Sequence, residues 1–331
     1  MSKDKSLVLK GVAILMMLWL HCFNIGINKA IKYEDVFIGD YPLCDIIARC
    51  SSPVSLYILL SGYGLWFTYS RNGHIHVFKR LLKLFVLYWL TILIFIPLGS
   101  YKGVYNFDLS EIIYYLLAYK TTFNATLWFL FPYSLLLLFS NNIFKLLRSF
   151  PKQIVLYSIV IGIIAYGLSW ATIHKYICFP HDSFSILINS IGMLPAFVIG
   201  AYMNTTEDIT RFVKKYGYHQ KMLLCVFLGI TFLRCFTEFS FIVHLIYTIC
   251  IVLFVCAINI PKRLFRCLKF AGTLSTVVWF IHAYLLWYIY GDYFFGLKYP
   301  IPIFISIVFV SFLIGWIINK MYLKLLKLLS L

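Results

Sequence analysis

Charged residues are scarce in this sequence. Only 12% of its 331 residues are Asp, Glu, Lys or Arg, whereas 62% are hydrophobic. A water-soluble globule needs more polar surface than this to cover its core, so the composition excludes one. Apolar runs long enough to cross about 30 Å of hydrocarbon recur along the chain, whereas transmembrane strands would give short alternating segments. The sequence therefore predicts an all-α, polytopic membrane protein.

Acidic residues are fewer still. The 12 Asp and Glu residues stand against 29 Lys and Arg residues, which gives a formal net charge of +17. A nucleic-acid-binding protein gathers such an excess on one face or in one tail. Here the basic residues form short clusters between apolar runs. We therefore expect no nucleic-acid partner, and interpret the clusters as signals of membrane topology.

The nine cysteines lack the spacing of a metal site. They include no Cys-x-x-Cys pair, and no histidine stands at metal-ligand spacing from them. The sequence thus predicts neither a disulfide framework nor a bound metal.

Long polar stretches are also absent. The longest, at about residues 30–50 and 204–221, are too short to bury a core of their own. The first apolar run has no small-residue cleavage site after it, which is typical of a retained helix rather than a signal peptide. We expect a single transmembrane domain over residues 1–331, with no soluble domain after the last helix.

The apolar runs predict about ten transmembrane helices. Their approximate ranges are 7–27, 52–70, 81–99, 126–141, 153–172, 183–203, 222–237, 241–259, 270–290 and 301–319. Basic clusters at residues 3–10, 71–83, 145–152, 211–221, 262–269 and 320–327 mark alternate helix ends. The positive-inside rule places these ends, and both termini, in the cytoplasm.

His21 is the strongest candidate for chemistry. Within residues 7–27 only Lys10 and His21 are ionisable at ordinary pH, and such groups inside a membrane are costly unless they serve a purpose. If Lys10 marks the cytoplasmic boundary, His21 lies about 16 Å further along the helix, near mid-membrane. A neutral imidazole there is suited to accept a proton. The alternative is an imidazole that only packs between helices and binds a backbone carbonyl.

Arg80 and Lys83 form a second cationic group. They are three residues apart and share one helix face, so together with Lys10 they are suited to bind phosphate. Equally, they are basic residues of the kind that only set topology. Ser61 and Tyr63 lie in a small-residue segment of the second predicted helix, where they either line a polar seam or serve helix packing.

His282 lies about 12 residues into the ninth predicted helix. That spacing places it about 18 Å deep, close to the level predicted for His21. Two histidines at one level are suited to flank a single cavity.

Two ion pairs are also predicted near helix ends. Asp45 stands four residues before Arg49, and Arg234 stands four residues before Glu238. Each pair either serves only to neutralise its own charges or lines a groove for an acceptor.

Several short strings together resemble the acyltransferase 3 family of bacterial membrane acyltransferases. The first is Lys10-Gly11-Val12-Ala13 followed by His21, where the family has arginine, glycine, Ile or Leu, alanine and a histidine eleven residues after the arginine. The others are Leu60-Ser61-Gly62-Tyr63, the basic stretch from Lys79 to Trp89, the segment from Asn124 to Leu130 with Trp128, and Ser275 to His282. Lys10 departs from the family's arginine: it keeps the charge but lacks the bidentate geometry.

The resemblance implies an O-acyltransferase. It would move an acyl group, expected to be acetyl, from acyl-CoA to a hydroxyl of a cell-surface polysaccharide or its lipid-linked precursor. His21 would act as catalytic base or acyl carrier, Lys10, Arg80 and Lys83 would bind the donor phosphates, and Ser61, Tyr63, Trp128 and His282 would line the cavity.

The resemblance further implies that acetyl-CoA is a co-substrate and that no cofactor stays bound. It places the protein in the bacterial plasma membrane, among carbohydrate acceptors and glycan-assembly proteins. The alternative is a polysaccharide transporter or flippase with a polar conduit. Transporters of that kind commonly contain internal repeats, and no clear repeat occurs here.

Overall fold

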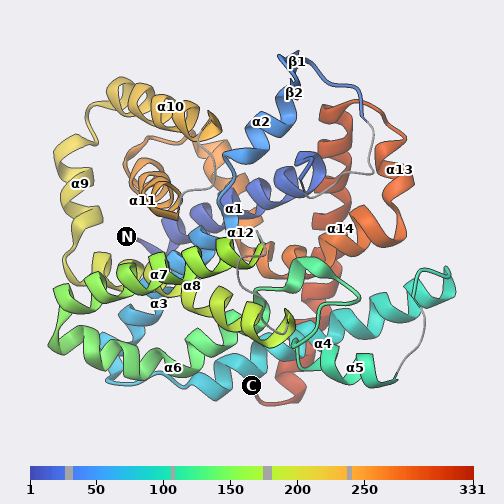
Figure 1. Ribbon diagram of the computed structural model, residues 1–331, viewed down its shortest axis with the longest axis horizontal. Helices are drawn as coiled ribbons and strands as arrows, with labels where there is room; N and C mark the ends of the chain where they lie inside the picture. Colours follow the sequence, from blue (N-terminus) through green and yellow to red (C-terminus); the bar gives the residue numbers. More distant parts are fainter. Residues whose placement is uncertain (27–32, 106–108, 174–180, 237–240) are drawn as a thin grey trace.

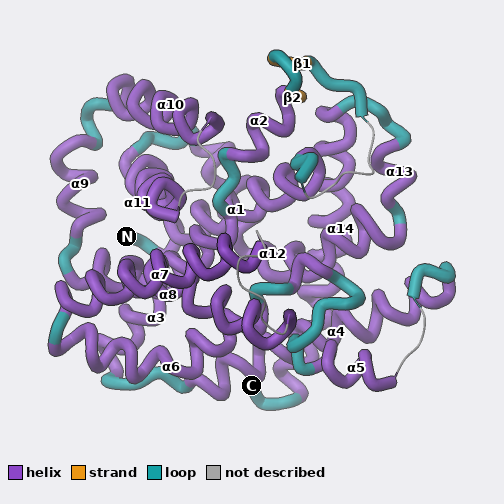
Figure 2. Tube along the Cα trace, viewed as in Figure 1, coloured by secondary structure: helices purple, strands orange, loops and turns teal. Residues whose placement is uncertain are grey.

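The structure is a computed structural model that describes residues 1–26, 33–105, 109–173, 181–236 and 241–331. Almost all of it is helix, and Figure 2 shows strands only in one small hairpin. That hairpin pairs β1 (Phe37–Ile38) with β2 (Tyr41–Pro42) in antiparallel register, with Phe37 opposite Pro42. The predicted all-α class is confirmed.

The helices follow one another with short connections. In chain order they are α1 (Lys3–Phe23), α2 (Leu43–Arg49), α3 (Pro53–Asn72), α4 (Val77–Tyr101), α5 (Leu109–Leu116), the 3₁₀ turn η1 (Ala125–Leu127), α6 (Leu130–Ser149), α7 (Pro151–Ile173), α8 (His181–Thr205), α9 (Asp208–Tyr216), α10 (Gln220–Phe236), α11 (Phe241–Ala257), α12 (Lys262–Ala283), the π-helix η2 (Tyr284–Ile289), α13 (Gly291–Phe295) and α14 (Pro300–Leu328).

Each of the ten predicted spans coincides with a helix, but not all ten qualify as membrane-spanning. Within the described residues, eight helical stretches are long and apolar enough to cross a membrane by length and composition. Helix α11 is apolar but shorter, and α10, predicted as a span, is not among the eight. The chain is thus a multi-pass membrane protein with eight candidate spans.

The end of α1 differs from its prediction. The helix runs from Lys3 to Phe23 instead of over residues 7–27, because Asn24 adopts an extended conformation while its N–H still binds the Leu20 carbonyl. His21 therefore lies in the last turn of α1, whereas the predicted range placed it six residues before the end of the helix. The mid-membrane depth of His21 stays a prediction.

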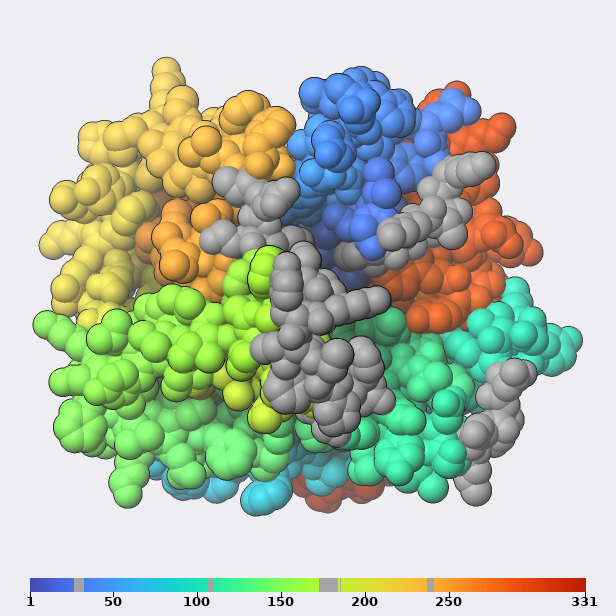
Figure 3. All heavy atoms as spheres, in the orientation of Figure 1, coloured from blue at the N-terminus to red at the C-terminus, as the bar shows by residue number. Residues whose placement is uncertain are grey.

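Helices α1 and α12 lie at the centre of the bundle (Figure 1). Helix α3 packs against α1, and α6, α7 and α8 lie beyond α3, whereas α14 packs against α1 and α12 from the other side. On the face shown in Figure 3, the blue segment that follows α1 lies between the orange α10–α11 region and the red α13–α14 region. The segment after α1 thus lies between elements from the second half of the chain.

Helices α3 and α8 cross with their backbones in direct contact. A Cβ atom built on Gly62 would lie 1.9 Å from the Phe197 carbonyl oxygen, and one on Gly200 would lie 2.0 Å from that of Leu59. Both distances are far below van der Waals contact, so only glycine fits at either position. Small residues allow this approach between membrane helices, where dispersion contacts replace the hydrophobic effect. The Gly62 of the predicted seam thus serves packing.

The structure joins Cys50 and Cys235 in a disulfide, with their Cα atoms 5.3 Å apart. The prediction of no disulfide was therefore wrong. The two cysteines are 185 residues apart, so spacing along the chain carries no sign of the pairing. The bond links the end of α2 to the end of α10, three residues before α3 begins at Pro53.

A substitution at Gly62 tests the helix crossing. Gly62→Ala should lower the free energy of unfolding by about 1–3 kcal/mol, because the added methyl group forces α3 and α8 apart. The matched control is Gly64→Ala in the same helix, where no atom lies within 4 Å of the new Cβ. Thermal unfolding in detergent measures both variants. Equal melting temperatures for the two would contradict the crossing.

Candidate active site

Helices α1 and α12 run parallel and touch through two glycines. A Cβ on Gly11 would lie 2.1 Å from the Leu268 carbonyl oxygen, and one on Gly272 would lie 1.8 Å from that of Leu7. Near the start of both helices, Asp4 and Lys269 form an ion pair of 2.8 Å. Together, these contacts fix the position of α1 along the axis of α12.

The same register brings two histidines together. His21 follows Gly11 by ten residues, and His282 follows Gly272 by ten residues. Nδ1 of His21 lies 2.7 Å from Nε2 of His282, and the two rings stack with centroids 4.9 Å apart and planes 13° from parallel. His282 is fully buried, whereas His21 is half-buried. The expected common level of the two histidines is confirmed.

Backbone carbonyls determine the tautomers of this histidine pair. Nδ1 of His282 lies 2.8 Å from the Trp279 carbonyl oxygen and 3.2 Å from that of Val278. Because a carbonyl only accepts, Nδ1 of His282 carries the hydrogen, and Nε2 of the neutral ring accepts. Nδ1 of His21 must then donate to it. The neutral His21 ring therefore has its lone pair on Nε2.

A loop from the middle of the chain holds the turn of α12 that carries His282. Asn124, fully buried, donates from Nδ2 to the Phe280 carbonyl at 3.3 Å. The indole of Trp279 donates to the Thr126 carbonyl at 3.2 Å. Residues 124–126 thus hold the side chain of Trp279, whose carbonyl binds His282, and the backbone of the next residue, Phe280.

Asn124 and Trp279 were not predicted as site residues, although both lie within the motif strings. One signal was available: asparagine is a favoured N-cap residue, and Asn124 caps η1 by accepting from the Thr126 N–H. By contrast Trp128, predicted to line the cavity, is 41% exposed and its ring contacts Phe129.

Lys10 lies beside the glycine contact on α1. It is half-buried, and its backbone carbonyl accepts a hydrogen bond of 3.2 Å from the Tyr57 hydroxyl. Its ammonium group makes no hydrogen bond or ion pair with any residue in the described part of the chain. A half-buried cation in this state is suited to receive an anionic ligand.

Arg80 and Lys83 lie in the first two turns of α4. Helix α4 begins at Val77, earlier than predicted, so both residues belong to its N-terminal end. Arg80 is exposed and donates to the Thr68 hydroxyl at 3.2 Å. Lys83 is half-buried, and its carbonyl accepts from the Tyr322 hydroxyl at 3.0 Å.

One face of α3 connects Lys10 to Arg80. Tyr57, Ser61 and Thr68 follow one another at intervals of four and seven residues, which places them on a common face. Tyr57 contacts the Lys10 carbonyl and Thr68 contacts Arg80. This polar face spans about 16 Å along the helix axis.

Ser61 and Tyr63, which were predicted together in one small-residue segment, have different hydrogen-bond partners. The Ser61 hydroxyl, on the polar face of α3, lies 3.0 Å from the hydroxyl of Tyr133 in α6. The Tyr63 hydroxyl instead accepts a hydrogen bond of 2.6 Å from the amino group of Met1. The structure therefore separates Tyr63 from the polar face that carries Ser61.

Comparison with known proteins gives one match. A family model described as an acyltransferase domain matches residues 8–320, nearly the whole chain and every predicted site residue. The chain belongs to the acyltransferase 3 family. No curated protein and no solved structure matches it. Membership in the acyltransferase 3 family confirms the resemblance of the motifs and identifies the chain as a membrane acyltransferase.

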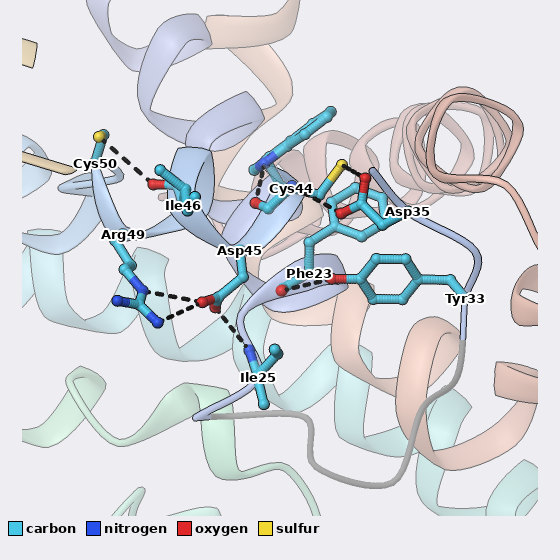
Figure 4. Close-up of polar contacts among 10 residues, drawn as sticks. Phe23, Ile25, Tyr33, Asp35, Cys44, Asp45, Ile46, Arg49 and Cys50 are labelled. Carbon is cyan, nitrogen blue, oxygen red and sulfur yellow. Dashed lines mark hydrogen bonds and ion pairs between the residues drawn. The ribbon is translucent and has the colours of Figure 1, made fainter. Parts of the chain in front are cut away.

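Helix α2 binds the chain segment that follows His21 and the end of α1 (Figure 4). The Ile25 N–H donates to the Asp45 carboxylate at 3.0 Å, and Arg49 pairs with the same carboxylate at 2.7 Å. Asp45 is buried, and the guanidinium of Arg49, which also donates from Nε at 2.9 Å, compensates its charge. The predicted Asp45–Arg49 pair is confirmed, whereas Glu238 of the second pair lies outside the described residues.

Tyr33 binds the last carbonyl of α1. Its hydroxyl donates to the Phe23 carbonyl at 3.0 Å, and its ring packs on the Phe23 ring. Burial, together with the nearby Asp35 carboxylate, raises the pKa of Tyr33, so the hydroxyl keeps the proton that it donates. The end of α1 that carries His21 is thus bound from two directions.

Removal of the Asp45 carboxylate tests this attachment. Asp45→Ala should lower the free energy of unfolding by about 1.5–3 kcal/mol, the cost of lost hydrogen bonds to a charged group. Asp40→Ala, at an exposed carboxylate nearby, is the matched control. Thermal unfolding in detergent distinguishes them, and an unchanged melting temperature for Asp45→Ala would refute the attachment.

Proposed function

We propose that this acyltransferase transfers an acetyl group from acetyl-CoA to a hydroxyl of a cell-surface polysaccharide or its lipid-linked precursor. His21 performs the chemistry, and Lys10, Arg80 and Lys83 bind the donor. The proposal places the enzyme in a bacterial plasma membrane with both termini in the cytoplasm, as the basic clusters favour. Glycan-assembly proteins are its expected partners.

The observation that carries the proposal is the hydrogen-bonded histidine pair. His282 is bound to carbonyls through Nδ1, so it accepts from His21 and leaves the lone pair of His21 on Nε2. A catalytic base or nucleophile needs such a lone pair, oriented by a second group. The arrangement resembles other catalytic pairs, in which the base is held in one tautomer by a fixed acceptor.

The transfer then follows by proton exchange at Nε2 of His21. As the acceptor hydroxyl oxygen forms a bond with the thioester carbonyl carbon, Nε2 takes the hydroxyl proton. The carbon–sulfur bond breaks, and the CoA thiolate leaves with the proton that Nε2 returns. The products are the acetyl ester and free CoA. In the alternative course, Nε2 itself carries the acetyl group between donor and acceptor.

The polar face of α3 supports the donor site. Arg80 and Thr68 stand at one end of it, and Tyr57 with Lys10 stands about 16 Å away. Lys10 in turn lies eleven residues before His21 on α1, again about 16 Å. We infer that the donor phosphates lie among the three cations while the thin acyl-bearing arm extends towards His21.

Loss of the His21 imidazole should abolish transfer. His21→Ala is expected to release no CoA from labelled acetyl-CoA above background, because the group that takes the hydroxyl proton or carries the acetyl group is lost. CoA release and acceptor labelling by purified protein measure it, with a panel of polysaccharide acceptors. His74→Ala, at an exposed histidine between α3 and α4, is the control.

The outcomes separate the function classes. Normal transfer by His21→Ala would refute its role. Absence of donor-dependent CoA release from the unmodified protein with every acceptor would instead favour a transporter. Release of CoA without any acceptor, with label retained on the protein, would identify the acyl-carrier course.

Replacement of Lys10 tests the donor site. Lys10→Ala should raise the KM for acetyl-CoA about tenfold or more, the effect of one lost hydrogen bond to a charged group, and change kcat little. Lys10→Arg keeps the charge and should stay close to the unmodified protein. Lys152→Ala, at an exposed lysine on α7, is the control. A lower kcat with unchanged KM would contradict donor binding by Lys10.

A further inference from the structure

A π-helix follows the buried histidine directly. Helix α12 ends at Ala283, and η2 covers Tyr284–Ile289, with an i to i+5 hydrogen bond from the Tyr290 N–H to the Leu285 carbonyl. π-helical turns are rare and occur frequently at functional sites. This one begins two residues after His282, so its effect on the neighbouring side chains bears on the site.

The π-helix changes which side chain shares a face with His282. Trp287 comes five residues after His282. On an α-helix with 3.6 residues per turn, a residue five positions on is rotated by about 140° and faces away. In a π-helix the hydrogen bonds run from i to i+5 and each residue turns the chain by a smaller angle, so Trp287 lies closer to the face of His282. Both side chains then meet the same helix, α1.

Trp287 contacts His21 in two ways. Its indole N–H donates to the His21 carbonyl oxygen at 3.2 Å. Its ring also packs against the imidazole, with centroids 5.0 Å apart and planes at 74°. His282 stacks on the same imidazole with planes 13° from parallel. The His21 ring is thus held by a parallel ring and by a nearly perpendicular one.

The hydrogen bond from Trp287 also satisfies a carbonyl group at the end of α1. His21 is in the last turn, where carbonyl groups have no partner within the helix. In a bundle with little water such a carbonyl must be bound by another side chain. Trp287 supplies that donor, just as Tyr33 does for Phe23. The backbone and the ring of His21 are therefore bound by one residue.

We propose that Trp287 is a positioning residue for His21, and that the π-helix exists to bring it there. This inference depends on the proposed function for its catalytic consequence. Trp287 keeps the His21 ring in the orientation in which Nδ1 donates to His282 and Nε2 points to the reacting groups. Loss of the indole releases the ring, so the chemical step slows while donor binding, which lies elsewhere, stays unchanged.

Two variants separate the contributions of the indole. Trp287→Phe keeps an aromatic ring but removes the N–H, and should lower kcat about five- to tenfold, the effect of one neutral hydrogen bond. Trp287→Leu removes both contacts and should lower kcat about a hundredfold, as expected for a misplaced catalytic group. The KM for acetyl-CoA should stay within about twofold in both variants, since neither substitution touches the residues that bind the donor.

Trp316→Leu is the matched control. Trp316 is a partly exposed tryptophan on α14 that contacts Lys320, so its loss should leave kcat and KM unchanged. A Trp287→Leu protein with normal kcat would overturn the positioning role. A Trp287→Phe protein whose kcat is as low as that of Trp287→Leu would overturn it too. A raised KM at constant kcat would also overturn it.

A second measurement does not depend on catalysis. Diethyl pyrocarbonate modifies neutral imidazoles, and mass spectrometry of the peptides reports the rate at each histidine. Modification of His21 should be several-fold faster in Trp287→Leu than in the unmodified protein, while the exposed His74 serves as internal standard. An unchanged His21 rate would refute the proposal even if no acyl transfer is found, so failure of the function and of this inference are distinguishable.

Discussion

The backbones of α1 and α12 contact each other at Gly11 and Gly272, and the geometry of the site follows from this contact. A Cβ at either position would lie about 2 Å from a carbonyl oxygen of the other helix, so the two axes would have to separate. With both glycines in place, the helices run parallel in one register. His21 and His282, each ten residues further on, therefore arrive at the same level with their nitrogens 2.7 Å apart. Lys10, directly before Gly11, is held at the same contact.

The groups that complete hydrogen bonding at the helix ends are also the groups that orient His21. An unpaired polar atom in an apolar bundle costs several kcal/mol, so a hydrogen-bond partner at the end of a helix stabilises the fold. The end of α1 is bound by Trp287, Tyr33 and Asp45. His282 satisfies its own Nδ1 on carbonyls of α12. The stability of the helix ends and the geometry of the proposed site thus depend on the same hydrogen bonds.

The sequence predicted the long helices well and their ends less well. Apolar runs mark where a helix must lie, but the end of α1 at Phe23 depends on Asn24 and Asp45, which belong to the connection and to the next helix. Helices α2, α5, α9 and α13 were missed because short helices are stable only through their packing partners. Trp287, five residues after His282, would face away from it on an α-helix, and only the π-helix in the structure turns it towards His21.

By itself the sequence determined the helical membrane class, the order of the apolar helices, the two histidines within apolar runs and the motifs of the acyltransferase 3 family. These depend on composition and on local periodicity, which a single chain segment carries in full. Only the tertiary structure decided that His21 and His282 form a hydrogen bond, that Ser61 and Tyr63 have separate partners, and that Cys50 joins Cys235. The reason is physical: such contacts depend on the register and rotation of helices far apart in sequence, which backbone packing at a few glycines sets.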